Sequence, residues 1–336
     1  MTSDPIYSSS QPVVAVVGAT GLVGQVLLQV LAQRHFPVSR LVPMAGPRSV
    51  GQRLVFRGQT WTVLPASAQG FVGVDLVFFA ATGELSRELA PTALAAGARV
   101  IDKSATWRMH PEVPLVVPEV NGGLIDANTR QVSSPNCTTT GLVMALEPLH
   151  RAAGLRSVQV TTLQAASGAG RLALEELESQ NADLVHGNPL RNSFWPRPLA
   201  GNALPVCDRL ELDGTSLEER KLLEETRKIM GLPELGMVAT CTRVPVAVGH
   251  GAAVWVDLER ELSVGEASTA LGDFPGVRVM EQPTALDVVD QDEVLVGRIR
   301  QPLSGPGIQF WQVSDNLRKG AATNAVQIAE CMLQQN

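Results

Sequence analysis

The stretch Val13-Val-Ala-Val-Val-Gly-Ala-Thr-Gly-Leu-Val-Gly24 decides which fold class this chain of 336 residues adopts. Its first five residues are apolar and mostly β-branched, which predicts a buried strand, and the glycines at 18, 21 and 24 predict a tight turn. A segment with the apolar spacing of a helix follows. A glycine turn between strand and helix lets a pyrophosphate approach the main chain at the helix N-terminus. The stretch therefore predicts a dinucleotide site, with a plain tight turn as the alternative.

The segment around this motif, Pro12–Gln33, carries no charge and is mostly apolar, so a hydropathy scan can read it as a membrane span. Three glycines, a threonine and three glutamines interrupt it, however. We therefore expect a buried strand of a parallel sheet with a helix packed on it.

The first 135 residues alternate between predicted strands and helices. Strands are expected at 40–44, 75–80 and 98–102, and a helix at 84–96 that Pro91 can kink or restart. Short turns connect these elements. The alternation is typical of a doubly wound parallel sheet of the Rossmann type, which is an α/β fold.

The pattern changes after about residue 135, where long strands with few helices predict an α+β second domain. The expected helices are 138–153, a helix opened by the capping box Ser216-Leu-Glu-Glu219 and ending near Gly231, and 264–271. The expected strands are 157–164, 238–246, 252–258, 294–299 and 308–313. A last helix, 317–333, has an apolar face that can pack on the first domain. We therefore expect one domain of residues 1–135 with 317–336 and a second of residues 136–316.

The composition excludes several classes of protein. The net charge is −6 and aromatic residues make up 4%, whereas a nucleic-acid surface needs clustered Lys and Arg or stacking aromatics. The four cysteines are widely spaced and the five histidines lack paired spacing, so we expect neither a disulfide scaffold nor a metal site. Reduced thiols indicate the cytoplasm. The polar segment Met1–Pro12 lacks the pattern of a secretory signal and is expected to be a frayed leader.

The loop after the second predicted strand bears on the form of the cofactor. An NAD site needs an acidic residue there to hold the ribose 2′-OH. The loop Ala45-Gly-Pro-Arg-Ser49 has none, and the guanidinium fork of Arg48 can pair with a 2′-phosphate. This predicts NADP, and the alternative is a solvated loop arginine.

Cys137 stands at the start of an apolar helix, in the segment Ser134-Pro-Asn-Cys137. A helix dipole stabilises a thiolate at its N-terminus, and the thiolate is the nucleophilic form of cysteine. Cys137 is therefore a candidate nucleophile, and an inert core cysteine is the alternative. The segment Gln164-Ala-Ala-Ser-Gly-Ala-Gly170 ends a predicted strand in a turn that can offer N–H groups to an anion.

Further candidates lie in the segment CTRVPVAVGHG, residues 241–251. A buried Arg243 needs an anion, and its fork suits a carboxylate. His250 is expected to titrate near neutrality and to move a proton to and from a thiol or hemithioacetal, unless it is only structural. Glu225 and Lys228 lie on one face of a predicted helix, where an exposed ion pair is the simplest interpretation.

Several segments, taken together and in order, resemble the aspartate-β-semialdehyde dehydrogenase family over about residues 13–329. They are GATGLVG, ATWRMHPEVPLVVPEVN, SPNCTTTG, QAASGAG, ETRKIMG, TRVPVAVGH and DNLRKGAATNAVQIAE. The resemblance implies NADPH-dependent reductive dephosphorylation of L-4-aspartyl phosphate to L-aspartate 4-semialdehyde through a cysteine thioester. This reaction belongs to the synthesis of lysine (through diaminopimelate), threonine, methionine and isoleucine. It also implies a cytoplasmic homodimer with small-molecule substrates, inorganic phosphate among them, whose second domain binds substrate and dimerises.

The resemblance further implies roles for individual residues. Cys137 matches the acylated nucleophile, His250 the acid/base partner, and Gln164 the residue that orients substrate and nucleophile. The residues that match substrate contacts are Arg243 at the α-carboxylate, Glu225 at the ammonium, Arg108 and Lys228 at the phosphate, and Asn136. The residues that match cofactor contacts are Gly18, Thr20, Gly21, Leu22, Val23, Gly24, Arg48, Ser49, Ser167, Gly168 and Asn316.

Three positions depart from the family pattern. Lys103 stands where Asn is common before Arg108, Gly251 where Ser is common after His250, and Gly46 where Ser is common before Arg48. We expect Lys103 to alter the affinity for phosphate and Gly46 to weaken the preference for NADP over NAD.

Two other functions are compatible with these motifs. A reductase acting on N-acetyl-γ-glutamyl phosphate shares the thioester chemistry, but an acetylated amine needs no acid such as Glu225. A catalytically silent paralogue is expected to lose its nucleophile, whereas this chain keeps Cys137 together with Gln164, Arg243 and His250.

Overall fold

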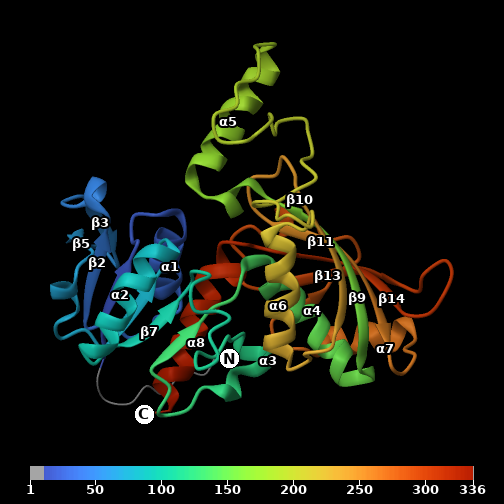
Figure 1. Cartoon of the computed structure of the whole chain (residues 1–336), viewed down its shortest axis with the longest axis horizontal. Coiled ribbons are helices and arrows are strands. Elements are labelled where there is room, and N and C mark those ends of the chain that lie inside the picture. The colour runs from blue at the N-terminus through green and yellow to red at the C-terminus, as the bar shows by residue number, and fades with distance from the viewer. Residues whose placement is uncertain (1–10, 336) are drawn as a thin grey trace. The chain divides into compact units, whose positions relative to one another are not determined.

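The computed structural model describes residues 11–335 and consists of two compact units (Figure 1). The first unit comprises Met1–Pro135 and Ala321–Asn336, and the second comprises Asn136–Gly320. Both ends of the chain thus belong to one unit and its middle to the other. Residues 1–10 of the expected leader lie outside the described residues.

The first unit is built on a six-stranded sheet in which all neighbouring strands are parallel. The strand order β5-β2-β1-β6-β7-β8 diverges in both directions from β1 and β6, as in a doubly wound sheet. The strands are β1 (Val13–Val17), β2 (Arg40–Ala45), β5 (Leu64–Pro65), β6 (Leu76–Phe79), β7 (Arg99–Asp102) and β8 (Gln131–Ser133). The predicted Rossmann-type α/β class is confirmed.

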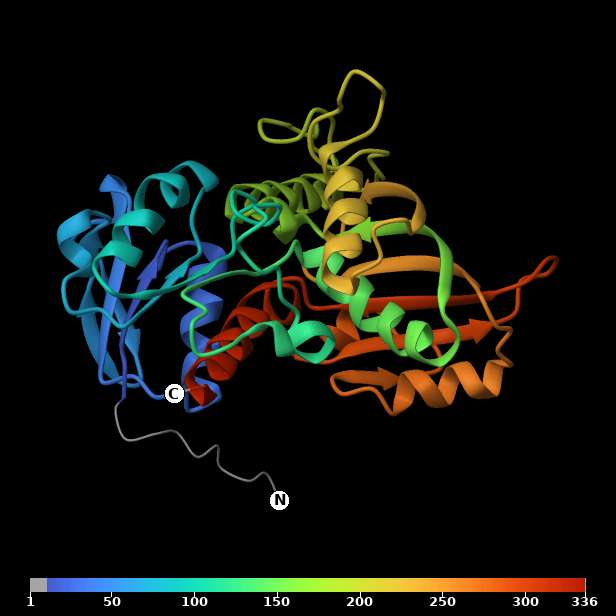
Figure 2. The same ribbon diagram turned by 60° about the horizontal axis from the view of Figure 1, so that its bottom comes forward.

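Helices cover both faces of this sheet, because successive residues of a strand point to opposite faces. Val14 and Val16 of β1 share a core with residues of α1 and α8, and Ala15 and Val17 share another core with residues of α2. Figure 2 shows α1 beside α8, although they come from opposite ends of the chain. The helices of the unit are α1 (Leu22–Gln33), α2 (Gly83–Ala95), α3 (Pro118–Asn121) and α8 (Thr323–Gln334).

The charge-free segment at the start is β1 and α1, as expected. Within residues 11–335, no helix is both long and apolar enough to cross a membrane. Pro91 neither ends nor restarts α2, because it is exposed and water can satisfy the carbonyl that loses its donor. Short elements were not predicted, since each has few residues to show a period; they include the hairpin of β3 (Arg53–Phe56) and β4 (Gln59–Thr62).

The glycine turn after β1 is closely packed. Gly18 has φ +88°, a left-handed conformation that favours glycine, and a Cβ there would lie 2.3 Å from the Ala80 oxygen. A Cβ on Gly24 would lie 2.1 Å from the Gly18 oxygen. The motif therefore brings the first turn of α1 into contact with the strand end, which no residue with a side chain permits.

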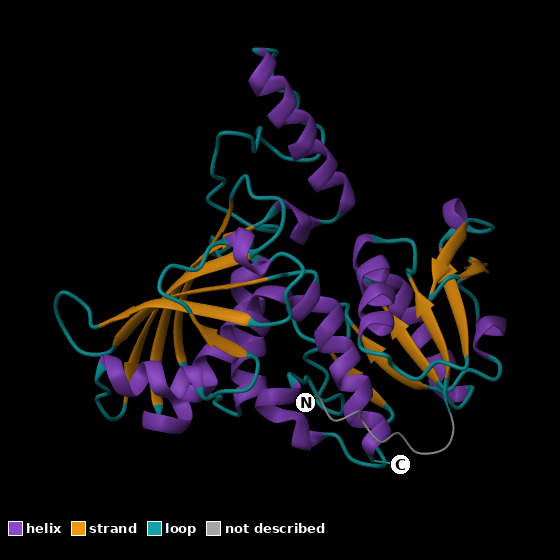
Figure 3. Cartoon of the chain, turned by 180° about the vertical axis from the view of Figure 1, so that it is seen from behind, coloured by secondary structure: helices purple, strands orange, loops and turns teal. Residues whose placement is uncertain are grey.

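The second unit holds a mixed six-stranded sheet of order β10-β9-β11-β14-β13-β12 (Figure 3). β9 is parallel to β10 and antiparallel to β11, and β14 is antiparallel to both of its neighbours. The strands are β9 (Leu155–Gln164), β10 (Gly236–Arg243), β11 (His250–Leu258), β12 (Val277–Val279), β13 (Val294–Arg300) and β14 (Ile308–Ser314). The expected strand 238–246 ends at Arg243, because Pro245 lacks the N–H that a ladder needs.

One layer of helices packs on this sheet: α4 contacts β9, β11, β13 and β14 and also packs against α6 and α7. The helices of the second unit are α4 (Cys137–Ala153), α5 (Arg171–His186), α6 (Leu217–Met230) and α7 (Val264–Gly272). The predicted α+β class and the capping box of α6 are confirmed. α5 was not predicted, because it buries only Ala173, Leu177 and Gln180 and so shows little amphipathic pattern. The predicted last helix divides into a π-helical turn, Arg318–Ala322, and α8.

Gly24→Ala tests the close packing of the glycine turn. The added methyl group has to displace α1 from β1, so we expect a loss of about 1–3 kcal/mol and a melting temperature lowered by several degrees. The control is Gly123→Ala, where a Cβ would meet nothing within 4 Å and stability should hold to within about 0.5 kcal/mol. Equal melting temperatures for the two variants would contradict the packing argument.

Candidate active site

The turn that follows β1 presents a helix N-terminus without a side-chain cap. Gly21 is the N-cap of α1 and has no side chain that could cap the helix, and the first turn holds no acidic residue. The N–H groups of Gly18 and Ala19 donate to the Met44 oxygen at 2.8 and 3.1 Å, which ties the turn to β2. These features suit a pyrophosphate, because the open N–H groups and the helix dipole both favour an anion.

Arg48 and Ser49 follow the next strand of the sheet, in the 3₁₀ turn Pro47–Ser49. Val17 pairs with Met44, so the carboxyl ends of β1 and β2 lie at the same edge of the sheet. Arg48 is exposed, and the loop contains no carboxylate that would accept from a ribose hydroxyl. The residues at this edge therefore fit a dinucleotide.

Arg108 is buried in the first unit and is held by main-chain oxygens. Its Nε donates to Ser134 O at 3.1 Å and its Nη2 to Lys103 O at 2.7 Å. The Lys103 ammonium donates to Ser134 Oγ at 3.3 Å and to Pro135 O at 2.9 Å. Lys103, which departs from the family pattern, thus adds a second positive charge on the segment that precedes Asn136.

Cys137 is the first residue of α4 and is half-buried. Its neighbour Asn136 caps the helix, since Oδ1 accepts from Thr138 N at 2.8 Å and from Thr139 N at 3.3 Å. A Cβ on Gly320 would lie 2.9 Å from the Cβ of Cys137, so this glycine leaves room beside the thiol. A helix N-terminus of this kind favours the thiolate.

The buried cysteines of this unit differ from Cys137. Burial raises the pKa of Cys207 to about 12 and also raises the pKa of Cys241, so both remain thiols.

Gln164, Arg243 and His250 lie at one end of the second sheet. Arg243 of β10 pairs with Gln164 of β9. Gly251 of β11 pairs with Leu163, so His250 stands beside Gln164 on the other side. All three side chains are buried. The strand register therefore brings together candidates that are up to 86 positions apart in the chain, counted from Gln164 to His250.

His250 is neutral, and its proton lies on a defined nitrogen. Nδ1 accepts from the Ala165 N–H at 3.0 Å, so the neutral ring carries its proton on Nε2. Among residues 11–335, nothing hydrogen-bonds to the buried Nε2. Desolvation, assisted by the charge of Arg243, lowers the pKa well below the ordinary 6.5. The expectation that His250 titrates near neutrality is therefore wrong, because burial disfavours the imidazolium.

Arg243 has a buried donor that awaits an acceptor. Nη1 donates to Ala165 O at 2.7 Å, and the guanidinium lies 5.6 Å from the ring centre of Trp195. Its Nε is buried and has no hydrogen-bond partner within the described chain. A Cβ on Gly168 would lie 3.0 Å from Nη1 and 2.7 Å from His250 Nε2, so glycine keeps this side of both groups open. An anion such as a carboxylate would satisfy the arginine.

The Ser/Gly-rich turn after β9 is not an open anion site. The N–H groups of Ala166, Ser167, Gly168 and Gly170 all donate to carbonyl oxygens at 2.8–3.1 Å, so the expectation that they bind an anion is wrong for these groups. The side chains remain polar. Asn316 Nδ2 lies 2.9 Å from Ser167 Oγ, and Asn316 Oδ1 accepts from Gly249 N at 3.0 Å.

Glu225 and Lys228 are not an exposed surface pair. The Glu225 carboxylate is buried and accepts from Asn136 N at 2.6 Å. Lys228 is half-buried, and burial lowers the pKa of its ammonium. The simple interpretation is wrong for Glu225, because α6 turns this carboxylate toward the N-terminus of α4.

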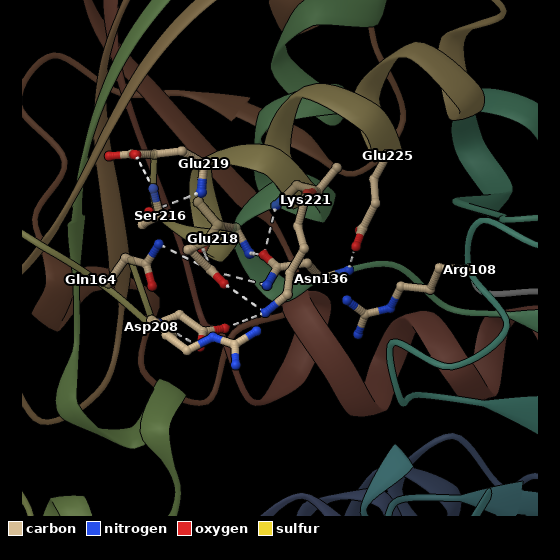
Figure 4. A network of polar contacts seen from close by, with 12 residues as sticks. Arg108, Asn136, Gln164, Asp208, Ser216, Glu218, Glu219, Lys221 and Glu225 are labelled. Carbon is tan, nitrogen blue, oxygen red and sulfur yellow. Dashed lines mark hydrogen bonds and ion pairs between the residues drawn. The ribbon is translucent and has the colours of Figure 1, made fainter. Parts of the chain in front are cut away.

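Sequence reasoning missed Glu218, which Figure 4 shows pointing toward Asn136 and Gln164. It is buried on α6 in the same stripe as Leu222, Glu225 and Ile229. The available signal was its spacing, since residues at i, i+4, i+7 and i+11 share one helix face and two of these four are carboxylates. The neighbouring Glu219 completes the capping box and is the carboxylate that the sequence motif identifies.

Gly251, which departs from the family pattern, lies close to Trp311 of β14. A Cβ at Gly251 would lie 2.4 Å from the Trp311 ring, so a serine does not fit beside this tryptophan.

Within residues 11–335, no group of three or more His, Cys, Asp or Glu could hold a metal ion.

His250→Gln tests the neutral state of the imidazole. The unfolded chain binds a proton at His250 below about pH 6.5 and the folded chain does not, so stability falls as the pH drops below 6.5. This contribution reaches about 1.4 kcal/mol per pH unit, and the glutamine variant should lack it. Melting curves between pH 5 and 8 give the comparison. Parallel pH dependence in the two proteins would mean that His250 accepts a proton in the folded state.

Comparisons with known proteins agree with this architecture. A family model described as the NAD binding domain of semialdehyde dehydrogenase matches residues 13–127, and one described as the dimerisation domain matches residues 146–319. Aspartate-semialdehyde dehydrogenase of Legionella pneumophila is 43% identical over 95% of each chain. That of Aquifex aeolicus is 44% identical over 96% of this chain and 98% of its own.

Solved structures give the same result. The crystal structure of aspartate semialdehyde dehydrogenase II from Vibrio cholerae, complexed with ASA, superposes with a TM-score of 0.94 at 39% identity. The match covers 97% of this chain and 99% of that one. The predicted resemblance is confirmed, and so is the predicted class of oxidoreductase. The chain belongs to the aspartate-semialdehyde dehydrogenase family.

Proposed function

We propose that this protein catalyses the NADPH-dependent reductive dephosphorylation of L-4-aspartyl phosphate to L-aspartate 4-semialdehyde, with Cys137 as the nucleophile. The observation that carries the proposal is Cys137 at the capped N-terminus of α4, in the unit where Gln164, Arg243 and His250 form one row. The names and near-complete overlap of the relatives support the substrate.

Two charged groups of opposite sign suit the amino-acid part of the substrate. The buried Nε of Arg243 is a donor for the α-carboxylate. The buried carboxylate of Glu225 is the acid that a free ammonium needs, which favours aspartyl over N-acetylglutamyl phosphate. For the phosphate we propose Arg108 and Lys228, with Lys103 as a further charge in the first unit.

The chemistry follows from the thiol and the imidazole. The thiolate of Cys137 attacks the acyl carbon, the C–O bond to phosphate breaks, and a thioester forms. NADPH, when bound, would supply the hydride that reduces this thioester to the aldehyde, with the C–S bond breaking to return the thiolate of Cys137. Gln164 orients the acyl group beside the nucleophile. His250 serves as the acid/base residue, and its Nε2 proton can hydrogen-bond the acyl oxygen as negative charge develops there.

For the cofactor we propose NADP, held by the first unit and by the turn after β9. The glycine turn, residues 18–24, would hold the pyrophosphate, and Arg48 and Ser49 the 2′-phosphate. Ser167, Gly168 and Asn316 would contact the nicotinamide half. The domains would then be a cofactor domain of residues 1–135 with the last helix, and a catalytic domain from residue 136 to about 316.

We also propose a homodimer formed through the second unit. The helices α4, α6 and α7 form one layer on the sheet, whereas the side chains that point away from them are exposed or half-exposed. These side chains include Gln159, Thr161, Ala253, Trp255 and Trp311. The match to a dimerisation domain over residues 146–319 supports this assembly. Four free thiols support a reducing location, the cytoplasm.

The direct test is an assay in the oxidative direction with aspartate semialdehyde, inorganic phosphate and NADP, following NADPH formation. We expect turnover that depends on phosphate. Parallel reactions with N-acetylglutamate semialdehyde, and with NAD, distinguish the alternatives. Turnover of the acetylated substrate but not of aspartate semialdehyde would reject the proposed substrate, and no turnover of either would favour a silent paralogue.

Cys137→Ser tests the nucleophile. We expect phosphate-dependent activity to fall by about 10³-fold or more, because a serine hydroxyl in this position is a poor nucleophile. NADP binding, measured by calorimetry, should be unchanged. The control is Cys331→Ser, which changes a half-buried thiol of α8 and should leave activity intact. More than a few per cent residual activity in the Cys137 variant would exclude the thioester mechanism.

Arg48→Ala tests the choice between NADP and NAD. Loss of a charge-assisted contact to the 2′-phosphate should reduce the ratio of kcat/KM for NADP over NAD by about 10- to 100-fold. Arg53→Ala, an exposed arginine on β3, is the matched control. An unchanged ratio in the Arg48 variant would mean that Arg48 is a solvated loop arginine that does not contact the 2′-phosphate.

A further inference from the structure

One carboxylate joins the amide side chains of Asn136, the residue before Cys137, and Gln164. Glu218 Oε1 accepts from Asn136 Nδ2 at 2.9 Å and from Gln164 Nε2 at 3.2 Å (Figure 4). The hydroxyl of Thr138 lies 3.4 Å from the same oxygen. Glu218 thereby connects the residue before Cys137 on α4 with the last residue of β9.

The surroundings of Glu218 keep its negative charge in place. The side chain is 7% exposed, and its Oε2 lies 3.5 Å from the ammonium of Lys221. Lys221 in turn donates to Asp208 at 2.5 Å. Burying a carboxylate is costly unless hydrogen bonds and a countercharge offset the loss of water, and here both are present.

An ionised carboxylate only accepts hydrogen bonds, so both amides must present their NH₂ groups to it. For Asn136 this directs Oδ1 at the N–H groups of Thr138 and Thr139, which caps α4. The opposite orientation would place NH₂ against those N–H groups and remove the cap at Cys137. For Gln164, whose second N–H lies 3.4 Å from Thr162 Oγ1, the carbonyl oxygen is directed away from Glu218.

We propose that Glu218 is a positioning residue of the reaction: it sets the orientation of the Asn136 amide, which caps the helix at Cys137, and of the Gln164 amide. The inference rests on the proposed function, in which Cys137 attacks the acyl group and Gln164 orients it. Glu218 acts only through these two residues. Stabilising α6 does not explain its contacts, because Glu219 completes the capping box of that helix.

Glu218→Gln is the variant that separates positioning from packing. It keeps the size of the side chain but removes its charge, and its NH₂ group has to face either the Lys221 ammonium or the two amides, so the hydrogen bonds that orient Asn136 and Gln164 are weakened or lost. We expect kcat to fall about 10- to 100-fold, with KM for aspartate semialdehyde changed less than threefold. Glu218→Asp, which keeps a carboxylate, should recover part of kcat relative to the glutamine variant.

Glu219→Gln is the matched control. It makes the same change on the neighbouring residue, whose oxygens accept, among the residues that the structure describes, from the main-chain N–H groups of Cys241 and Ser216. Its melting temperature can fall, but its kcat should stay within about twofold of wild type. A kcat for Glu218→Gln within twofold of wild type, or an equal loss in both variants, would overturn the proposal.

A second measurement needs no substrate. The rate of Cys137 alkylation by iodoacetamide, followed by mass spectrometry from pH 5 to 10, reports the thiolate. Loss of the Asn136 cap in Glu218→Gln should shift the midpoint of this profile to higher pH, and Glu219→Gln should leave it in place. If the alkylation midpoint shifts in Glu218→Gln but the wild-type protein does not turn over aspartate semialdehyde, the positioning role is supported and the proposed function is rejected. If the wild-type protein is active but the midpoint does not shift in Glu218→Gln, the positioning role alone is rejected.

Discussion

The hydrogen bonds of Asn136 are the constraint on which the rest of the candidate site depends. Its side-chain oxygen caps α4, its side-chain nitrogen donates to Glu218, and its main-chain N–H donates to Glu225. One residue therefore sets where α4 begins, and Cys137 is the first residue of that helix. Because α6 supplies both carboxylates, the start of α4 is held by a helix that lies some eighty residues later in the chain.

The buried polar groups of the second unit are of two kinds, those that have hydrogen-bond partners in the described chain and those that have a buried nitrogen without one. Glu218 and Glu225 accept from N–H groups that would otherwise be unsatisfied. Arg243 and His250 keep one buried nitrogen each without a partner, which is costly unless a ligand completes them. Since burial keeps His250 neutral with its proton on Nε2, the site begins a reaction with a donor in place. The orphaned groups thus mark the side that substrate would occupy.

Some of this was predictable from local patterns, because the relevant physics is local. The glycine turn is recognised by the spacing of its three glycines, and the helix start at Cys137 by the Pro-Asn pair that precedes it. Glu218 and the state of His250 were not predictable in the same way. A carboxylate on an apolar helix stripe gives no partner by itself, and the pKa of an imidazole depends on burial by residues distant in sequence. The sequence did not predict α5 because most of its surface is solvated, so its apolar residues do not mark a clear helix face.

The sequence by itself determined the fold class of the first unit, the place of Cys137 at a helix start and the family, because these depend on periods, turns and motifs read along the chain. Only the tertiary structure decided which groups act together. The parallel pairing of β9 with β10 sets Gln164 beside Arg243, and the antiparallel pairing with β11 brings His250 to the same row. A register shift of one residue would turn each side chain to the opposite face, so strand pairing rather than composition assembles the site.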